Sequence, residues 1–229
     1  MVFAKTALGR YMNPPAKRNQ AYCPTDEEQI ANCITHSVFI LPSIFGAFFL
    51  SHLAKTSIQK SVAWLYGSGL FFLFLVSSLF HGVSLLKSYR KIRLLLHLGD
   101  RSVIYAFIAA SYMPWLLLQD VGDKGIMVAW LIWFAAVAGI FYTFIFHEKY
   151  KMIEIILYLI IGICPSFLFY FVEEAKGIKE LIIGGAFYVL GVPVFKCDGR
   201  IPFAHALWHI FVVCGALCHY YAVVIHLYL

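Results

Sequence analysis

The chain has 229 residues, of which 62% are hydrophobic and only 13% are charged. Soluble domains are about half apolar and about a quarter charged, so this composition excludes an ordinary soluble protein. The formal net charge is +6. In a membrane protein, such an excess of basic residues mainly reflects topology, because Lys and Arg are concentrated on one side of the bilayer. The six cysteines form no C-x-x-C pair, so no disulfide framework of the secreted type is expected.

Residues 1–30 are predicted to form a basic cytosolic arm, and residues 31–229 a membrane domain. The arm is polar, is broken by three prolines and has no apolar core of a secretory signal peptide. Thr25 and Glu28 have the spacing of a capping box, in which each side chain accepts a hydrogen bond from the other residue's backbone. This spacing predicts a short helix that leads into the membrane.

The rest of the chain consists of apolar runs of about 20 residues, the length that a helix needs to cross the bilayer core. We predict seven such spans, and the fold class is therefore all-α: a polytopic membrane protein with a seven-transmembrane helix bundle. The predicted spans are residues 31–53, 62–85, 95–118, 125–146, 152–172, 178–196 and 202–227. Prolines inside spans predict kinks, and these are Pro42, Pro114, Pro165 and Pro193.

The distribution of basic residues predicts the orientation of the bundle. Of the 18 Lys and Arg residues, most fall on the side of the amino terminus, and positive charge marks the cytosolic side. The amino terminus is therefore predicted to be cytosolic. An odd number of spans then places the carboxyl terminus on the opposite side, which is the reverse of a G-protein-coupled receptor and argues against that class.

Polar residues from three predicted spans converge at one depth. The second span ends with Ser77 and His81, and the third begins near Asp100. The seventh carries His205 and His209, four residues apart and therefore on one helix face. At a rise of about 1.5 Å per residue, these side chains lie roughly 6–12 Å inside the cytosolic ends of their helices. Ionisable side chains at such a depth are costly and usually mark a functional site.

Three imidazoles and one open position are the recurrent ligand set of a catalytic zinc ion. We therefore predict that His81, His205 and His209 bind Zn²⁺. Asp100 suits a catalytic role beside the metal, where it holds a water molecule or accepts its proton. Ser77 lies one helical turn before His81, and its hydroxyl can orient the substrate or stabilise an oxyanion. The alternative is a polar hydrogen-bond network that packs the bundle without a metal.

Two more histidines have open roles. His97 is either a substitute ligand or an interfacial partner for lipid phosphate. His36 enters the first span and either extends the polar layer or makes a structural hydrogen bond. The segment His147–Lys151 is predicted to be a solvated cytosolic turn near anionic headgroups.

In order and spacing, these residues resemble the progestin and adipoQ receptor (PAQR) family, which is related to hemolysin III. The motifs that carry the resemblance are Asn32-x-x-Thr35-His36, Ser77-x-x-x-His81, Asp100 and His205-x-x-x-His209. The segments Ile104–Tyr112, His147–Lys151 and Ile201–His209 look closest to its monocyte-to-macrophage differentiation factor branch. The resemblance covers the chain from Asn32 to Tyr221. It implies a zinc ion held by His81, His205 and His209, with Asp100 and Ser77 beside the bound water.

The resemblance also implies a place in a wider group of membrane hydrolases that includes alkaline ceramidases. Its nearest branch is associated with signalling and with Golgi and other internal membranes, so Golgi, endolysosomal or plasma membranes are expected. The long amino-terminal region of the adiponectin receptors is missing here, which argues against adiponectin binding.

Two functional hypotheses follow from the sequence. The first is a zinc-dependent hydrolase of a ceramide-type lipid amide, whose membrane lipid substrate reaches the metal laterally between helices. The second is a signalling receptor or scaffold with a structural zinc, whose basic cytosolic face, including Lys87–Arg93, recruits cytosolic signalling proteins and anionic lipid. No nucleic-acid partner is expected under either hypothesis.

Overall fold

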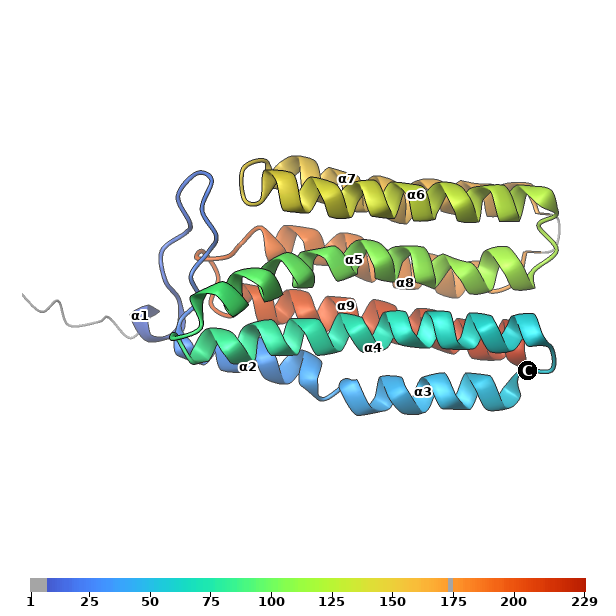
Figure 1. The fold of residues 1–229 in the computed structure, drawn as a ribbon, viewed down its shortest axis with the longest axis horizontal. Helices are drawn as coiled ribbons and strands as arrows, with labels where there is room; N and C mark the ends of the chain where they lie inside the picture. Colours follow the sequence, from blue (N-terminus) through green and yellow to red (C-terminus); the bar gives the residue numbers. More distant parts are fainter. Residues whose placement is uncertain (1–7, 173–174) are drawn as a thin grey trace, which may run out of the picture.

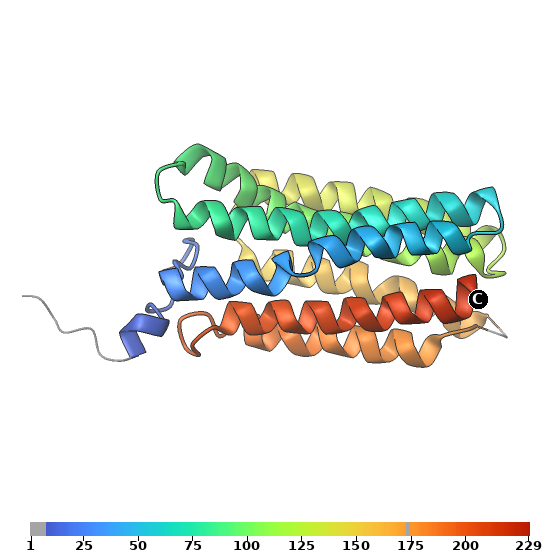
Figure 2. The ribbon, with the colours of Figure 1, turned by 90° about the horizontal axis from the view of Figure 1, so that it is seen from below.

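The computed structural model describes residues 8–172 and 175–229, and over these residues it is all-helical (Figure 1). Seven helical spans are long and apolar enough to cross a membrane within this described part. They lie side by side with their long axes aligned, as Figure 1 and Figure 2 show from two directions. The predicted seven-transmembrane bundle is confirmed.

Each predicted span corresponds to one helix or to two consecutive helices. The first span is α2 (Asp26–Ser37) followed by α3 (Ile40–Leu53), and the fifth is α7 (Lys151–Ile163) followed by a 3₁₀ helix (Cys164–Phe171). The others are α4 (Ser57–Leu85), α5 (Arg90–Leu118), α6 (Asp123–Phe146), α8 (Ile178–Phe195) and α9 (Ala204–Val223). A short α1 (Leu8–Tyr11) precedes the bundle, and a π-helical turn (Val224–Tyr228) extends α9.

The capping box predicted at the start of the first span is present. The Thr25 hydroxyl accepts a hydrogen bond from the Glu28 backbone N–H at 3.2 Å, and the Glu28 carboxylate accepts one from the Thr25 N–H at 2.8 Å. Acidic residues fill the first turn of α2, where they interact favourably with the helix dipole. The helix therefore begins at Asp26, a few residues before the predicted apolar span.

Prolines interrupt two of the spans. Pro42 has no N–H to donate to the carbonyl of Val38, four residues earlier, and the first span is broken between Ser37 and Ile40. In the same way, the fifth span changes from α to 3₁₀ geometry at Cys164, next to Pro165. The other two intramembrane prolines lie inside helices that continue as α5 and α8.

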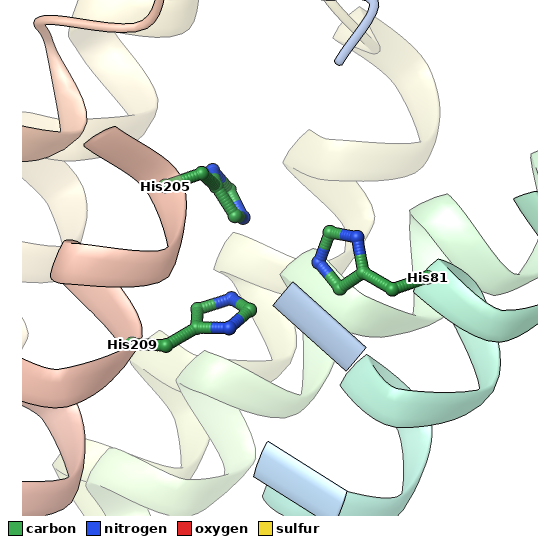
Figure 3. A group of neighbouring side chains, drawn as sticks. All are labelled: His81, His205 and His209. Carbon is green, nitrogen blue, oxygen red and sulfur yellow. The ribbon is translucent and has the colours of Figure 1, made fainter. Parts of the chain in front are cut away.

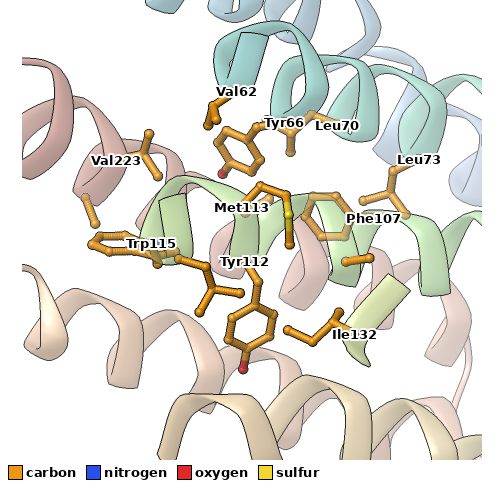
Figure 4. Close-up of a cluster of buried hydrophobic side chains, with 14 of the residues drawn as sticks. Val62, Tyr66, Leu70, Leu73, Phe107, Tyr112, Met113, Trp115, Ile132 and Val223 are labelled. Atoms are coloured by element: carbon orange, nitrogen blue, oxygen red, sulfur yellow. The ribbon is translucent and has the colours of Figure 1, made fainter. Parts of the chain in front are cut away.

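The hydrophobic core is centred on α5, which packs against α4 and α6. Figure 4 shows side chains of α4, α5, α6 and α9 meeting in this cluster, among them the fully buried Tyr66 and Trp115. α9 packs against both α8 and α2, so the first and last spans are neighbours. The bundle is closed by this contact, and the two ends of the chain contribute to one interior.

Residues 8–25 lie against one end of the bundle, which we call the arm end (Figure 1). The Tyr11 ring lies 5.8 Å from the ring of Phe203, in the connection between α8 and α9. The Lys151 ammonium donates a hydrogen bond to the backbone carbonyl of Gln20. The arm thus contacts the connection between α8 and α9 and the first residue of α7, and the predicted zinc ligands lie at the same end.

Candidate metal centre

Three histidines from two helices face one small space near the arm end. His81 comes from the last turns of α4, whereas His205 and His209 come from the first turns of α9 (Figure 3). One ring nitrogen of each residue lies within 4.8 Å of the corresponding nitrogens of the other two. His81 and His209 are each only 2% exposed. The group therefore has the spacing and burial of a site that could bind a metal ion.

The ring of His81 is held by a side chain of α2. Its Nδ1 lies 2.7 Å from the Gln29 side-chain oxygen, and because a carbonyl oxygen only accepts, Nδ1 carries the hydrogen. The other nitrogen, Nε2, is buried and has no hydrogen-bond partner among residues 8–172 and 175–229. Its lone pair is therefore free to bind a metal.

The ring of His209 is held in the same way from α2. Its Nδ1 lies 3.2 Å from the Asn32 backbone carbonyl and 3.0 Å from the Thr35 hydroxyl. That hydroxyl donates its own hydrogen to the same carbonyl at 2.9 Å, so it accepts from Nδ1. This assignment again leaves Nε2 as the nitrogen with a lone pair.

The third ring, His205, faces a carboxylate. Its Nδ1 lies 3.5 Å from Asp198, which belongs to the connection between α8 and α9. An acceptor behind Nδ1 orients a histidine and raises its basicity as a ligand, and metal-binding histidines almost always have one. All three histidines have such an acceptor, and their chemistry fits Zn²⁺ bound through Nε2.

Gln29 and Asp198 were not singled out in the sequence as members of the site. A signal for Gln29 was available, because Gln29, Asn32 and His36 recur on one face of a helix that enters the membrane. Asp198 lies in a connection without helical periodicity, and no spacing rule could have related it to His205.

Ser77 and Asp100 lie beside the three histidines. Ser77 is only 2% exposed, and its hydroxyl has no hydrogen-bond partner in the described part of the chain. Asp100 is partly buried on α5, and its carboxylate lies near His205 and Ser77. The catalytic roles of both residues stay predictions.

His97 does not join this group. Its Nδ1 lies 3.1 Å from Nε2 of His147, and together with Glu148 these residues form a second cluster of possible metal donors. The Glu148 carboxylate is, however, already paired with Arg101 and Lys151. Burial raises the pKa of Glu148, but these two cations outweigh that effect and the pKa is lowered. An added metal ion would have to compete with two charges already in place.

The expectation of a solvated turn at His147–Lys151 is wrong at Glu148, although Lys149 and Tyr150 are exposed. Glu148 is only 9% exposed, and burial also lowers the pKa of the neighbouring His147. The turn is drawn inwards because Arg101 on α5 pairs with Glu148 and also with Glu154 on α7. Long-range ion pairing therefore overrides the local polarity of the segment.

His36 is packed against the metal centre without making the hydrogen bond expected of a structural histidine. Its ring stacks on that of His209, with the centroids 3.8 Å apart and the planes at 15°. It is 3% exposed, and neither ring nitrogen has a hydrogen-bond partner within the described residues. The imidazole therefore extends the polar layer and leaves both ring nitrogens unpaired within the described residues.

Residues 26–220 match the haemolysin-III-related family. The chain belongs to the haemolysin-III-related family. It is 46% identical to the monocyte to macrophage differentiation factor of Homo sapiens over an alignment of 225 residues. This alignment covers 98% of this chain and 94% of the human protein. It is also 30% identical over 211 residues to the hemolysin-3 homolog of Bacillus subtilis (strain 168), which covers 88% of this chain and 95% of that one.

These matches confirm the resemblance to the PAQR and hemolysin III group and to its monocyte-to-macrophage differentiation factor branch. All three histidines and their α2 partners lie inside the region that matches the haemolysin-III-related family. With seven candidate spans, the protein is an integral multi-pass membrane protein.

Proposed function

We propose that this haemolysin-III-related protein is a zinc-dependent hydrolase of a ceramide-type lipid amide. The observation that carries the proposal is the grouping of three histidines, each with an acceptor at Nδ1 and each with one ring nitrogen within 4.8 Å of the others. A purely structural site typically closes its metal with four protein ligands, whereas three leave a position for water or substrate.

Zn²⁺ held by His81, His205 and His209 would supply Lewis acidity for the scissile carbonyl and would lower the pKa of a water molecule towards about 7. In this proposal Asp100 takes the proton of the attacking water and passes it to the leaving amine. Ser77 donates its hydroxyl hydrogen, unpaired within the described chain, to the oxygen that becomes negatively charged.

A lateral groove supports access from the lipid phase. It has a volume of about 240 Å³ and lies between α2 and α9, where it is lined by Ile34, Thr35, Val38, Phe39, Ile210 and Val213. The lining is apolar except for Thr35, and the Thr35 hydroxyl contacts the metal-facing His209. An acyl chain in this groove would bring its carbonyl end towards the metal centre without leaving an apolar environment.

The first experiment measures metal content by mass spectrometry of detergent-purified protein. We expect about one zinc per chain in the wild type, as a three-histidine site binds a single ion, and none in the double variant His205→Ala/His209→Ala. His219→Ala is the matched control, because His219 lies on the same helix but bonds to the Leu181 carbonyl away from the centre. The control should keep its zinc.

The second experiment offers the zinc-containing protein a panel of ceramides, other acylated amines and ester lipids, and follows release of the free acid. We expect amide cleavage that Asp100→Asn abolishes while zinc is retained. A zinc-loaded, monodisperse protein that cleaves nothing in the panel would refute the hydrolase.

The second candidate function is a membrane signalling receptor or scaffold with a structural zinc. It is supported by the basic start of α5, where Arg90, Lys91 and Arg93 are all exposed and can attract anionic lipid or acidic partner proteins. This alternative predicts that Asp100→Asn leaves signalling intact, because all three metal ligands remain. Loss of signalling in a well-folded Asp100→Asn protein would contradict it.

We also propose that the arm end faces the cytosol and that the protein resides in Golgi, endolysosomal or plasma membranes. The excess of basic residues near the arm end supports the orientation, and the relationship to the monocyte-to-macrophage differentiation factor branch motivates the compartment. Protease accessibility of an amino-terminal tag in sealed cells, together with microscopy, tests both statements.

A further inference from the structure

Buried polar atoms without hydrogen bonds gather next to the metal centre. They are the side-chain amide of Asn32, both ring nitrogens of His36 and the hydroxyl of Ser77. These three residues are 0%, 3% and 2% exposed, and none of these atoms has a partner in residues 8–172 or 175–229. Native proteins rarely leave buried polar groups unpaired, and each such group needs an explanation.

Their location relates them to the metal centre rather than to helix packing. Asn32 and His36 lie on the same face of α2 as Gln29, which holds the ring of His81. The backbone of Asn32 holds His209, and the ring of His36 stacks on it. One face of α2 therefore forms a wall of the metal centre, and this wall presents polar atoms that no described residue pairs with.

The chemistry of these atoms limits what they can bind. An amide offers both donors and acceptors, a neutral imidazole offers one of each, and a hydroxyl offers either. Arg101, which follows Asp100 on α5, is already paired with Glu148 and Glu154. Asn32, His36 and Ser77 add no Lys or Arg side chain to the wall, so a buried phosphate would depend on the metal ion alone to balance its charge. An uncharged group that carries hydroxyl or amide hydrogens would pair with all three residues.

We propose that Asn32 and His36, together with Ser77, form a hydrogen-bonding subsite that binds the uncharged, hydroxyl-bearing headgroup of the lipid and sets the headgroup specificity. The inference rests on the proposed function, because it places the headgroup beside the bond that is cleaved. The apolar groove between α2 and α9 reaches the same layer through Thr35. Groove and subsite together would hold the two ends of one amphipathic molecule.

The test uses two substitutions that replace the polar atoms by apolar groups of similar size, Asn32→Leu and His36→Phe. The phenyl ring keeps the stacking on His209, so His36→Phe removes little besides the two nitrogens. Binding to the detergent-purified, zinc-loaded full chain is measured with a fluorescent N-acyl amino alcohol in mixed micelles. Diacylglycerol and phosphatidic acid serve as uncharged and charged competitors.

We expect both variants to keep their zinc and to bind the probe at least about tenfold more weakly, the effect of losing roughly one good hydrogen bond. Their melting temperature should be unchanged or higher, because removing an unpaired buried polar group does not destabilise the protein alone. Ser77→Ala should weaken binding, whereas Ser78→Ala is the matched control, since the Ser78 hydroxyl already bonds to the Phe74 carbonyl.

Unchanged probe affinity in Asn32→Leu and His36→Phe would overturn the subsite, as would stronger competition by phosphatidic acid than by diacylglycerol. If Asn32→Leu does not fold, His36→Phe alone decides between these results. Probe binding without any hydrolysis by the wild type would refute the hydrolase and leave the subsite standing. Hydrolysis with the same KM in the wild type and in both variants would refute the subsite and leave the hydrolase standing.

Discussion

Replacing Gln29 with leucine removes the acceptor that holds the Nδ1 hydrogen of His81. The ligand set itself is untouched, because Gln29 contributes no atom to the metal. Loss of such an outer partner typically weakens metal binding by about 10- to 100-fold. This corresponds to about 1.4–2.8 kcal/mol of binding free energy. Gln29→Leu should therefore weaken zinc binding by this amount without abolishing it.

The same change has a second, separable cost. Because His81 is buried, its Nδ1–H is left without the Gln29 acceptor, and the folded state is destabilised by about 1–3 kcal/mol. Gln29→Glu keeps an acceptor at the same position and should bind zinc at least as tightly as the wild type. The assay is competition for zinc against a chromophoric chelator, with thermal unfolding of the metal-free protein measured in parallel.

Equal zinc affinity in the wild type, Gln29→Leu and Gln29→Glu would refute the reasoning. That result would mean that His81 binds no metal or that its orientation is set by packing alone. A loss of stability with unchanged zinc affinity would point to the second of these explanations.

Three more predictions follow from the arm end. Asp198→Ala should weaken zinc binding by about tenfold through the loosened His205 ring, as read in the same competition assay. Arg101→Met leaves Glu154 buried without its cation and Glu148 with Lys151 alone, and it should destabilise the protein by about 3–5 kcal/mol, seen as a lower melting temperature. The pKa of Glu148 is lowered in the folded state, so its ion pairs stabilise the protein above the ordinary value of 4.5 and are lost as the pH falls through the folded value. The wild type should therefore lose more stability between neutral and acid pH than Glu148→Gln, in which no carboxylate remains to be protonated.

The span pattern and the three-histidine group are the parts of this molecule that could be predicted from its sequence. Apolar runs of membrane length leave few alternatives to a helical bundle. A helix rises by a constant distance per residue, so the position of a residue in a span gives its depth in the bilayer. The depths of His81, His205 and His209 could therefore be compared before any contact was known. Their meeting in one layer required only that the spans carrying them be neighbours.

Other features depend on contacts that no local pattern records. Asp198 sits in a connection whose path is decided by the packing of α8 and α9. The burial of Glu148 results from a cation on a different helix, and its own neighbours in the sequence are polar. The break before α3 could be expected from Pro42. Its position at Val38 and Phe39 depends on which backbone hydrogen bond the proline removes.

The contact between α2 and α9 has a consequence for biogenesis. The metal centre takes its supporting groups from the first span and two of its ligands from the last, so it can form only after the final helix has entered the bilayer. A nascent chain that lacks this helix holds His81 and Gln29 but neither His205 nor His209. Metal uptake would thus report completed assembly. An ion that binds only the closed bundle also stabilises it. In metal-starved cells, a larger fraction of this protein should therefore be incompletely packed, and membrane proteases should degrade that fraction first.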